Sequence, residues 1–120
     1  MAKYHKYVFN TDEREFVGEF EKMYQKEQAE GFDSWHQENS MQLNRKFALA
    51  ILDMWNFSLI VDVGCGKGAL THLLKKNNNK VFGTDISSTA IKRAEARYPD
   101  IDFFELKVGN CFWKKHKSLI

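Results

Sequence analysis

The sequence predicts an α/β fold in which a partial parallel sheet of about three strands follows an N-terminal helical extension. From residue 58 onward, short β-branched or aromatic runs alternate with amphipathic segments in the order strand, helix, strand, helix, strand. This alternation implies right-handed crossovers and a parallel sheet with helices on its faces. The first 57 residues show helical spacing only. We therefore expect a helical extension or lid over residues 1–57 and a sheet-bearing part over residues 58–120.

Length and composition set limits on the function. The chain has 120 residues, of which 43% are hydrophobic, enough for the core of one domain. Its net charge of +2 is too small to predict a nucleic-acid partner. The His and Cys residues lack metal-ligand spacing, so no metal site is expected. The sequence has neither a signal-peptide pattern nor an apolar run of membrane-spanning length, which favours a cytoplasmic protein without a membrane partner.

Two helices are predicted in the extension. Asp12 and Glu15 have the spacing of a capping box, and the helical repeat that follows stops at Gly31. Ser40 is a candidate cap for a second helix. On that helix Arg45 could reach a carboxylate, but a solvent-facing role is expected. The apolar residues of that second helix recur every fourth position and predict a packing face: Leu43, Phe47, Ile51 and Trp55.

The sheet-bearing part predicts three strands and two helices. Residues 59–63 form the short β-branched run that is typical of a buried parallel strand. Residues 81–84 and 101–106 are the second and third strands. A short helix follows the first strand, and a longer one, capped by Ser87 or Ser88, ends at Pro99.

The segment between the first strand and its helix carries the strongest functional signal. It reads Asp62-Val63-Gly64-Cys65-Gly66-Lys67-Gly68. Glycine permits a tight turn and lets a ligand approach the backbone closely. The following helix presents free N–H groups that attract a phosphate or a carboxylate. Three glycines in this strand-to-helix context favour a ligand site over a plain turn, and the absence of Gly-Lys-Ser/Thr excludes a P-loop.

An acidic residue follows the second strand. Asp85 lies 21 positions beyond Gly64, a spacing that suits a carboxylate accepting hydrogen bonds from ribose hydroxyls. The alternative role for Asp85 is to cap the helix that follows it. Residues 64–69 also satisfy the dinucleotide fingerprint G-x-G-x-x-G/A, which leaves a nicotinamide cofactor as an alternative ligand.

The run from Asp62 to Gly68 resembles motif I of class I S-adenosylmethionine-dependent methyltransferases, and the resemblance extends over roughly residues 58–106. Nicotinamide-binding strands usually carry an apolar residue where Asp62 stands. The resemblance implies a Rossmann-like fold and S-adenosylmethionine as the cofactor. It places Asp62 near the methionine amino group or the sulfonium, and it makes the loop residues Gly64, Cys65, Gly66 and Gly68 part of the cofactor site.

Three further cofactor contacts follow from the same resemblance. Asp85 would bind the ribose, and Ile86 would pack on the adenine face. Where the family often has Gly-Asp after the third strand, this chain has Gly109-Asn110, whose amide oxygen can accept a hydrogen bond from the adenine amino group.

The expected function is methyl transfer from S-adenosylmethionine to an unidentified small-molecule acceptor. The sequence stops near a fourth strand, so we expect an N-terminal fragment in which no catalytic residue can be named. The strand at residues 61–63 would then form an apolar edge that favours self-association. The alternatives are a non-catalytic, truncated methyltransferase-like binding module and a fragment of a nicotinamide-dependent oxidoreductase.

Overall fold

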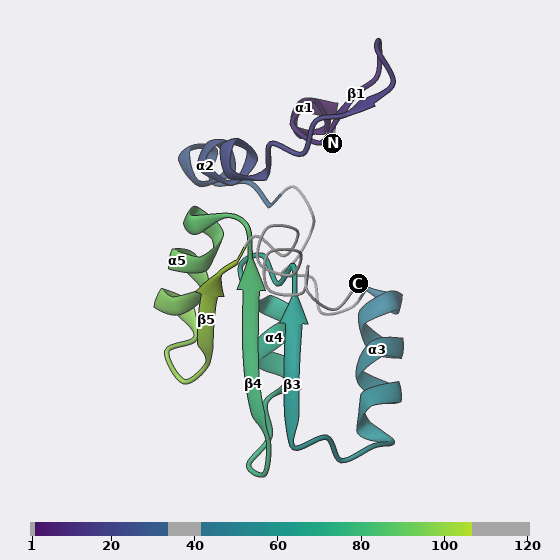
Figure 1. Cartoon of the computed structure of the whole chain (residues 1–120), viewed down its shortest axis with the longest axis vertical. Coiled ribbons are helices and arrows are strands. Elements are labelled where there is room, and N and C mark those ends of the chain that lie inside the picture. Colours follow the sequence, from purple (N-terminus) through teal and green to yellow (C-terminus); the bar gives the residue numbers. More distant parts are fainter. Residues whose placement is uncertain (1, 34–41, 107–120) are drawn as a thin grey trace, which may run out of the picture.

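The computed structural model describes residues 2–33 and 42–106. The extension contains α1 (Ala2–His5), the strands β1 (Phe9–Asn10) and β2 (Glu15–Phe16), α2 (Phe20–Glu30) and α3 (Leu43–Asp53). The sheet-bearing part follows as β3 (Leu59–Val63), α4 (Ala69–Leu74), β4 (Lys80–Asp85), α5 (Ser88–Arg97) and β5 (Asp102–Glu105). Figure 1 shows α1, the β1–β2 hairpin and α2 lying beyond the carboxyl ends of β3 and β4.

The predicted three-stranded parallel sheet is confirmed. Its strand order is β3-β4-β5, so that strands adjacent in sequence are also adjacent in space. Val61 pairs with Phe82 between β3 and β4, and Gly83 pairs with Phe103 between β4 and β5. Within the described residues β3 pairs on one side only, which agrees with the expected apolar edge.

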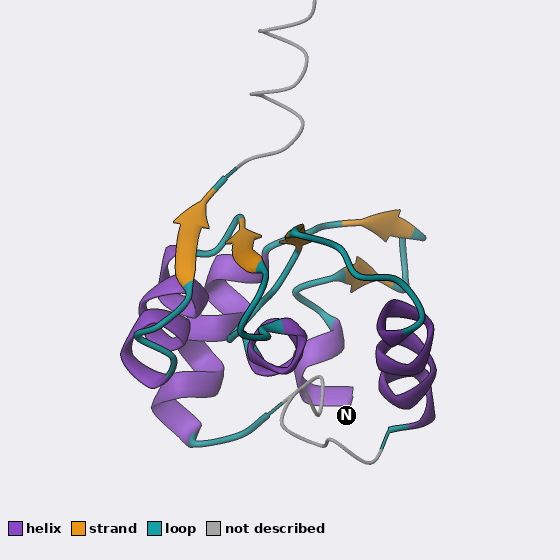
Figure 2. Ribbon diagram, turned by 90° about the horizontal axis from the view of Figure 1, so that it is seen from below, coloured by secondary structure: helices purple, strands orange, loops and turns teal. Residues whose placement is uncertain are grey.

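The helices of the described part do not cover both faces of the sheet. Figure 2 shows them gathered on one side of the strands, and α4 and α5 both contact β4. On the opposite face the apolar side chains of Leu59, Val61 and Val63 remain more than half exposed. Within residues 2–33 and 42–106 the helices thus lie on one face of the parallel sheet.

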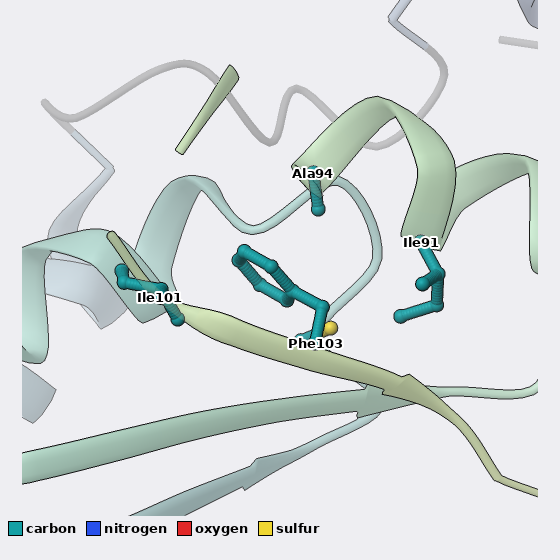
Figure 3. Packing of buried hydrophobic residues seen from close by; sticks show 5 residues of the cluster. Ile91, Ala94, Ile101 and Phe103 are labelled. Atoms are coloured by element: carbon teal, nitrogen blue, oxygen red, sulfur yellow. The ribbon is translucent and has the colours of Figure 1, made fainter. Parts of the chain in front are cut away.

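The main core lies between α5, β5 and the loop that follows β3. Ile91 and Ala94 on the inner side of α5 pack against Ile101 and Phe103, with Cys65 beside them (Figure 3). Residues three positions apart lie on the same face of a helix, so Ile91 and Ala94 face the sheet together. The core therefore directly supports the glycine-containing loop.

The predicted capping box at Asp12 is wrong. Asn10 accepts hydrogen bonds from the backbone N–H groups of Asp12 and Glu13 at 3.1 and 3.2 Å, and this turn joins β1 to β2. Side-chain bonds of this kind compete with helix caps in sequences rich in Asn and Asp. The helix begins only at Phe20, while its predicted end is confirmed by Gly31 in the left-handed conformation, with φ of 66°.

The apolar face of α3 is also placed differently from the prediction. No residue of α3 is buried, and Leu43, Phe47, Ile51 and Trp55 are 52–68% exposed. The recurrence of apolar residues at every fourth position shows correctly which face of the helix is apolar. It cannot show whether another element covers that face.

Candidate functional site

The glycine-containing loop, residues 64–68, is held against the end of β4. The N–H groups of Gly64 and Cys65 both donate to the carbonyl oxygen of Thr84, at 2.8 and 2.9 Å. Gly64, Gly66 and Gly68 have φ values of 77°, 56° and 84°, a region that side chains disfavour. The prediction that this turn needs glycine is therefore supported at three positions.

The carboxylate of Asp85 lies directly beside this loop. Its Oδ2 accepts a hydrogen bond from the N–H of Gly66 at 2.9 Å, and its Oδ1 accepts one from the N–H of Ser87 at 2.9 Å. The helix cap itself is Ser87, whose Oγ accepts from the N–H of Ala90 at 3.1 Å. Asp85 thus orders the turn before α5, and each of its oxygens keeps a second lone pair for another donor.

A cavity of about 350 Å³ opens beside the loop, within the range of ligand sites. A Cβ atom added to Gly64 would meet no atom within 4 Å, so the backbone is open to a ligand there. A second hollow, between α3 and α4, measures about 20 Å³, which is room for about one water molecule. The residues lining the larger cavity come from α3, β3, the loop and α4: Gln42, Asn44, Arg45, Ala48, Asp62, Gly64, Cys65 and Leu70.

The cavity carries opposite charges. Asp62 contributes a carboxylate from β3, while Arg45 contributes a guanidinium from α3. The sequence alone favoured a solvent-facing Arg45 over one that reaches a carboxylate, and the packing of α3 beside α4 places it in the same cavity as Asp62. A cavity lined by one cation and one anion suits a zwitterionic amino-acid group.

Burial raises the pKa of two groups, one beside the loop and one within it. Burial and the nearby charge of Asp85 raise the pKa of Asp62, although its Oδ2 accepts a 2.8 Å hydrogen bond from Thr71 that opposes the shift. Burial, followed by the charges of Asp85 and Asp62, raises the pKa of the Cys65 thiol to about 12. The thiol is therefore protonated near neutral pH and is no candidate nucleophile.

Of the predicted cofactor residues, Asp62, Gly64 and Cys65 line the cavity, whereas the lining does not include Gly66, Gly68, Asp85 or Ile86. Ile86 follows Asp85 and leaves 43% of its surface exposed, which keeps an apolar surface available beside the carboxylate. Asn110 lies outside the described residues. The predicted helix after the loop, α4, has only six residues, so its dipole is a weak source of anion binding.

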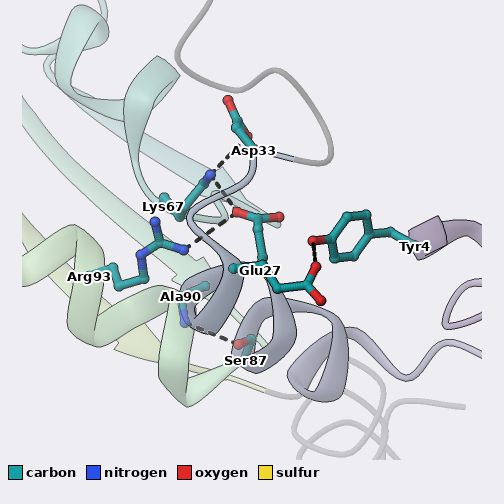
Figure 4. A network of polar contacts seen from close by, with 8 residues as sticks. Tyr4, Glu27, Asp33, Lys67, Ser87, Ala90 and Arg93 are labelled. Atoms are coloured by element: carbon teal, nitrogen blue, oxygen red, sulfur yellow. Dashed lines mark hydrogen bonds and ion pairs between the residues drawn. The ribbon is translucent and has the colours of Figure 1, made fainter. Parts of the chain in front are cut away.

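Sequence reasoning missed the contacts of α2 with the site. Glu27 on α2 bonds to Lys67 of the loop, with Glu27 Oε1 and Lys67 Nζ 2.6 Å apart (Figure 4). Glu21, earlier on the same helix, accepts hydrogen bonds from the hydroxyls of Ser87, Ser88 and Thr89 at the start of α5. No sequence signal pairs these residues, because each contact joins segments at least 40 positions apart.

We expect Glu21 to make the stability of the chain depend on pH. Burial alone would raise its pKa, but the hydrogen bonds from Ser87, Thr89 and Ser88 outweigh burial and lower the pKa from 4.5 to about 2. A lowered folded-state pKa gives stability that is complete above pH 4.5 and is lost as the pH falls toward 2. Urea unfolding of Glu21→Gln should show a weaker loss over this range than the unchanged chain, and equal slopes would contradict the assignment.

Comparisons with known proteins identify relatives of this chain. Residues 60–117 match the family model described as a methyltransferase domain. A protein of Invertebrate iridescent virus 6 with the provisional name methyltransferase 235L is 31% identical over 70 residues, 57% of this chain and 26% of that protein. The trans-aconitate 2-methyltransferase of Afipia carboxidovorans is 38% identical over 53 residues, 42% of this chain and 21% of that enzyme.

A solved structure supports the same fold. The S-adenosylmethionine-dependent methyltransferase from Anabaena variabilis superimposes with a TM-score of 0.62 at 20% identity, covering 73% of this chain and 37% of that one. The chain thus spans about a quarter or less of the two relatives' sequences and about a third of the solved chain. Within the described residues, no helix combines the length and apolarity needed to cross a membrane, and no three His, Cys, Asp or Glu residues group as metal ligands.

Proposed function

We propose that this chain, which carries the cofactor-binding part of a class I S-adenosylmethionine-dependent methyltransferase domain, binds that cofactor beside residues 64–68 and serves a methyl-transfer reaction. The observation that carries the proposal is the contact between the glycine-containing loop and Asp85, the N–H of Gly66 donating to the carboxylate at 2.9 Å. The cofactor supplies an activated methyl group on a sulfonium. The chain's own residues bind and orient it.

The described residues fit the methionine and nucleoside ends of such a ligand. Asp62 would accept hydrogen bonds from the amino group of the methionine part, and the open backbone at Gly64 would let the ligand approach closely. The carboxylate of Asp85 would accept hydrogen bonds from the ribose hydroxyls through its remaining lone pairs. Ile86 and Asn110 would border the adenine. Cys65 and Gly66 would contribute through the backbone of the loop, because the Cys65 side chain packs in the core.

The reaction itself requires an acceptor held in line with the methyl group and shielded from water. The proposed acceptor is a small molecule. The open face of the sheet, with Val61 and Val63 exposed on β3, supports the further proposal that the chain self-associates. No residue of this chain is assigned a catalytic role.

Calorimetric titration with S-adenosylhomocysteine tests the cofactor proposal. We expect one saturable site on the folded chain, and Asp85→Asn should weaken binding by roughly tenfold or more, since a charged acceptor is replaced by a neutral amide that competes as a donor. Oxidised nicotinamide dinucleotide serves as the comparison ligand, and Asp102→Asn, an exposed aspartate of β5, as the matched variant.

Absence of S-adenosylhomocysteine binding by the folded chain would refute the cofactor proposal. Tighter binding of the nicotinamide dinucleotide would favour the oxidoreductase alternative. The same samples, examined by analytical ultracentrifugation, test self-association, and a strictly monomeric chain would contradict that part.

A further inference from the structure

The contacts between α2 and the loop centre on a buried ion pair, Glu27 with Lys67. Glu27 is 0% exposed and Lys67 is 4% exposed. Lys67 Nζ lies 2.6 Å from Glu27 Oε1 and 2.8 Å from Asp33 Oδ1, and Arg93 Nη1 on α5 lies 3.4 Å from the same Glu27 oxygen. Figure 4 shows these side chains converging from α2, the segment after it, the loop and α5. Carboxylates and cations thus alternate around the buried ion pair in the part of the chain that the structure describes.

Lys67 connects this group to the backbone of the proposed cofactor site. It stands between Gly66 and Gly68, both with positive φ. The N–H of Gly66 is bonded to Asp85, while the side chain of Lys67 is bonded to Glu27. The loop is therefore held from two directions. Asp85, the residue proposed to bind the ribose, contacts it on one side, and α2 contacts it on the other.

The same helix, α2, also contacts the turn between β4 and α5. Glu21 accepts hydrogen bonds from Ser87 and Thr89, directly after the turn that Asp85 orders. One helix therefore contacts both the residue inside the loop and the turn that follows β4. Displacement of α2 would break the ion pair between Glu27 and Lys67 and the hydrogen bonds of Glu21 with the start of α5.

Resting on the proposed function, we infer that Glu27 is a positioning residue for the cofactor site, and that docking of α2 and binding of the cofactor strengthen each other. Glu27 touches no ligand in this scheme. It holds Lys67, and through Lys67 it holds the backbone of the loop in the ligand-ready conformation. Because coupling between two sites is reciprocal, the cofactor should in turn stabilise the docked position of α2.

The test compares two variants that remove the same charge from the same helix. Glu27→Gln removes the buried carboxylate that bonds to the loop. Glu30→Gln removes a carboxylate whose side chain is 27% exposed and which bonds to Lys26 of α2 and Tyr4 of α1. The second variant therefore controls for the loss of charge and for a general loosening of the extension.

We expect the two variants to differ in their affinity for S-adenosylhomocysteine, measured by calorimetry on chains whose folding is checked by circular dichroism. The affinity should fall roughly tenfold with Glu27→Gln, in the usual range of coupling between sites. Glu30→Gln should change it by less than about twofold, because ion pairs near the surface contribute little.

Hydrogen exchange supplies a readout that a purely structural role would not alter. S-adenosylhomocysteine should slow exchange of the amides of residues 20–30 in the unchanged chain and in Glu30→Gln, and this slowing should be reduced in Glu27→Gln. If the unchanged chain binds the ligand and Glu27→Gln binds it equally well, the inference is overturned while the proposed function stands.

Other outcomes are also decisive. If Glu27→Gln does not fold, hydrogen exchange in the unchanged chain provides the test. If the amides of α2 then exchange equally fast with and without bound S-adenosylhomocysteine, the inference is overturned. If the folded, unchanged chain binds no S-adenosylhomocysteine, the proposed function itself fails.

Discussion

Gly68→Ala is expected to cause a large loss of stability, by two separable effects. The φ of 84° at this position costs a residue with a side chain about 1–2 kcal/mol. In addition, a Cβ at position 68 would lie 2.7 Å from the ring of Phe103 and 3.2 Å from the Cβ of Ala94. Both neighbours belong to the main core, where overpacking costs about 1–3 kcal/mol. Urea unfolding measures the sum.

Two other glycines separate backbone strain from the clash. Gly64 and Gly31 have φ values of 77° and 66°, and a Cβ at either position meets no atom within 4 Å. The free energy of unfolding of Gly64→Ala and of Gly31→Ala should therefore fall only by the backbone cost of the positive φ, about 1–2 kcal/mol. Of these two, only Gly64→Ala should also weaken S-adenosylhomocysteine binding, because Gly64 lines the cavity and Gly31 ends α2. A loss at Gly68 no greater than at Gly31 would show that the loop does not rest on Phe103 as described.

Lys67→Met is the second change with a large expected effect. It would leave Glu27, which is fully buried, facing the more distant guanidinium of Arg93 without the ammonium group that lies closest to it. Removing one partner of a buried ion pair typically costs about 3–5 kcal/mol, because the remaining charge is poorly compensated. The free energy of unfolding, measured in urea, should fall by an amount of that order.

A surface ion pair provides the control. Lys76 pairs with Asp53, and their side chains are 47% and 63% exposed. Lys76→Met should cost less than about 1 kcal/mol, since exposed pairs contribute little. The double variant Lys67→Met with Glu27→Gln should be less destabilised than the sum of the single changes, because it removes the unpaired charge. Additive losses would contradict a direct interaction between the two side chains.

Features governed by neighbouring residues could be predicted from the sequence. The three strands, the glycine turn with its positive φ values and the helix end at Gly31 are confirmed, and of the two candidate caps, Ser87 and Ser88, the structure has Ser87. The capping box at Asp12 failed although it is also a local signal, because Asn10 offers the same N–H groups a competing acceptor. Local patterns are dependable where one backbone conformation has no close rival.

By itself, the sequence determined the α/β class, the three strands and the position of the loop, because backbone angles and apolar spacing depend on residues close along the chain. Only the tertiary structure decided that Glu27 meets Lys67, that Arg45 lines the cavity and that the apolar face of α3 stays exposed. These contacts depend on which elements pack together. From the sequence alone, a charged residue or an apolar helix face could contact many other segments, and only the packing of the elements determines which one it contacts.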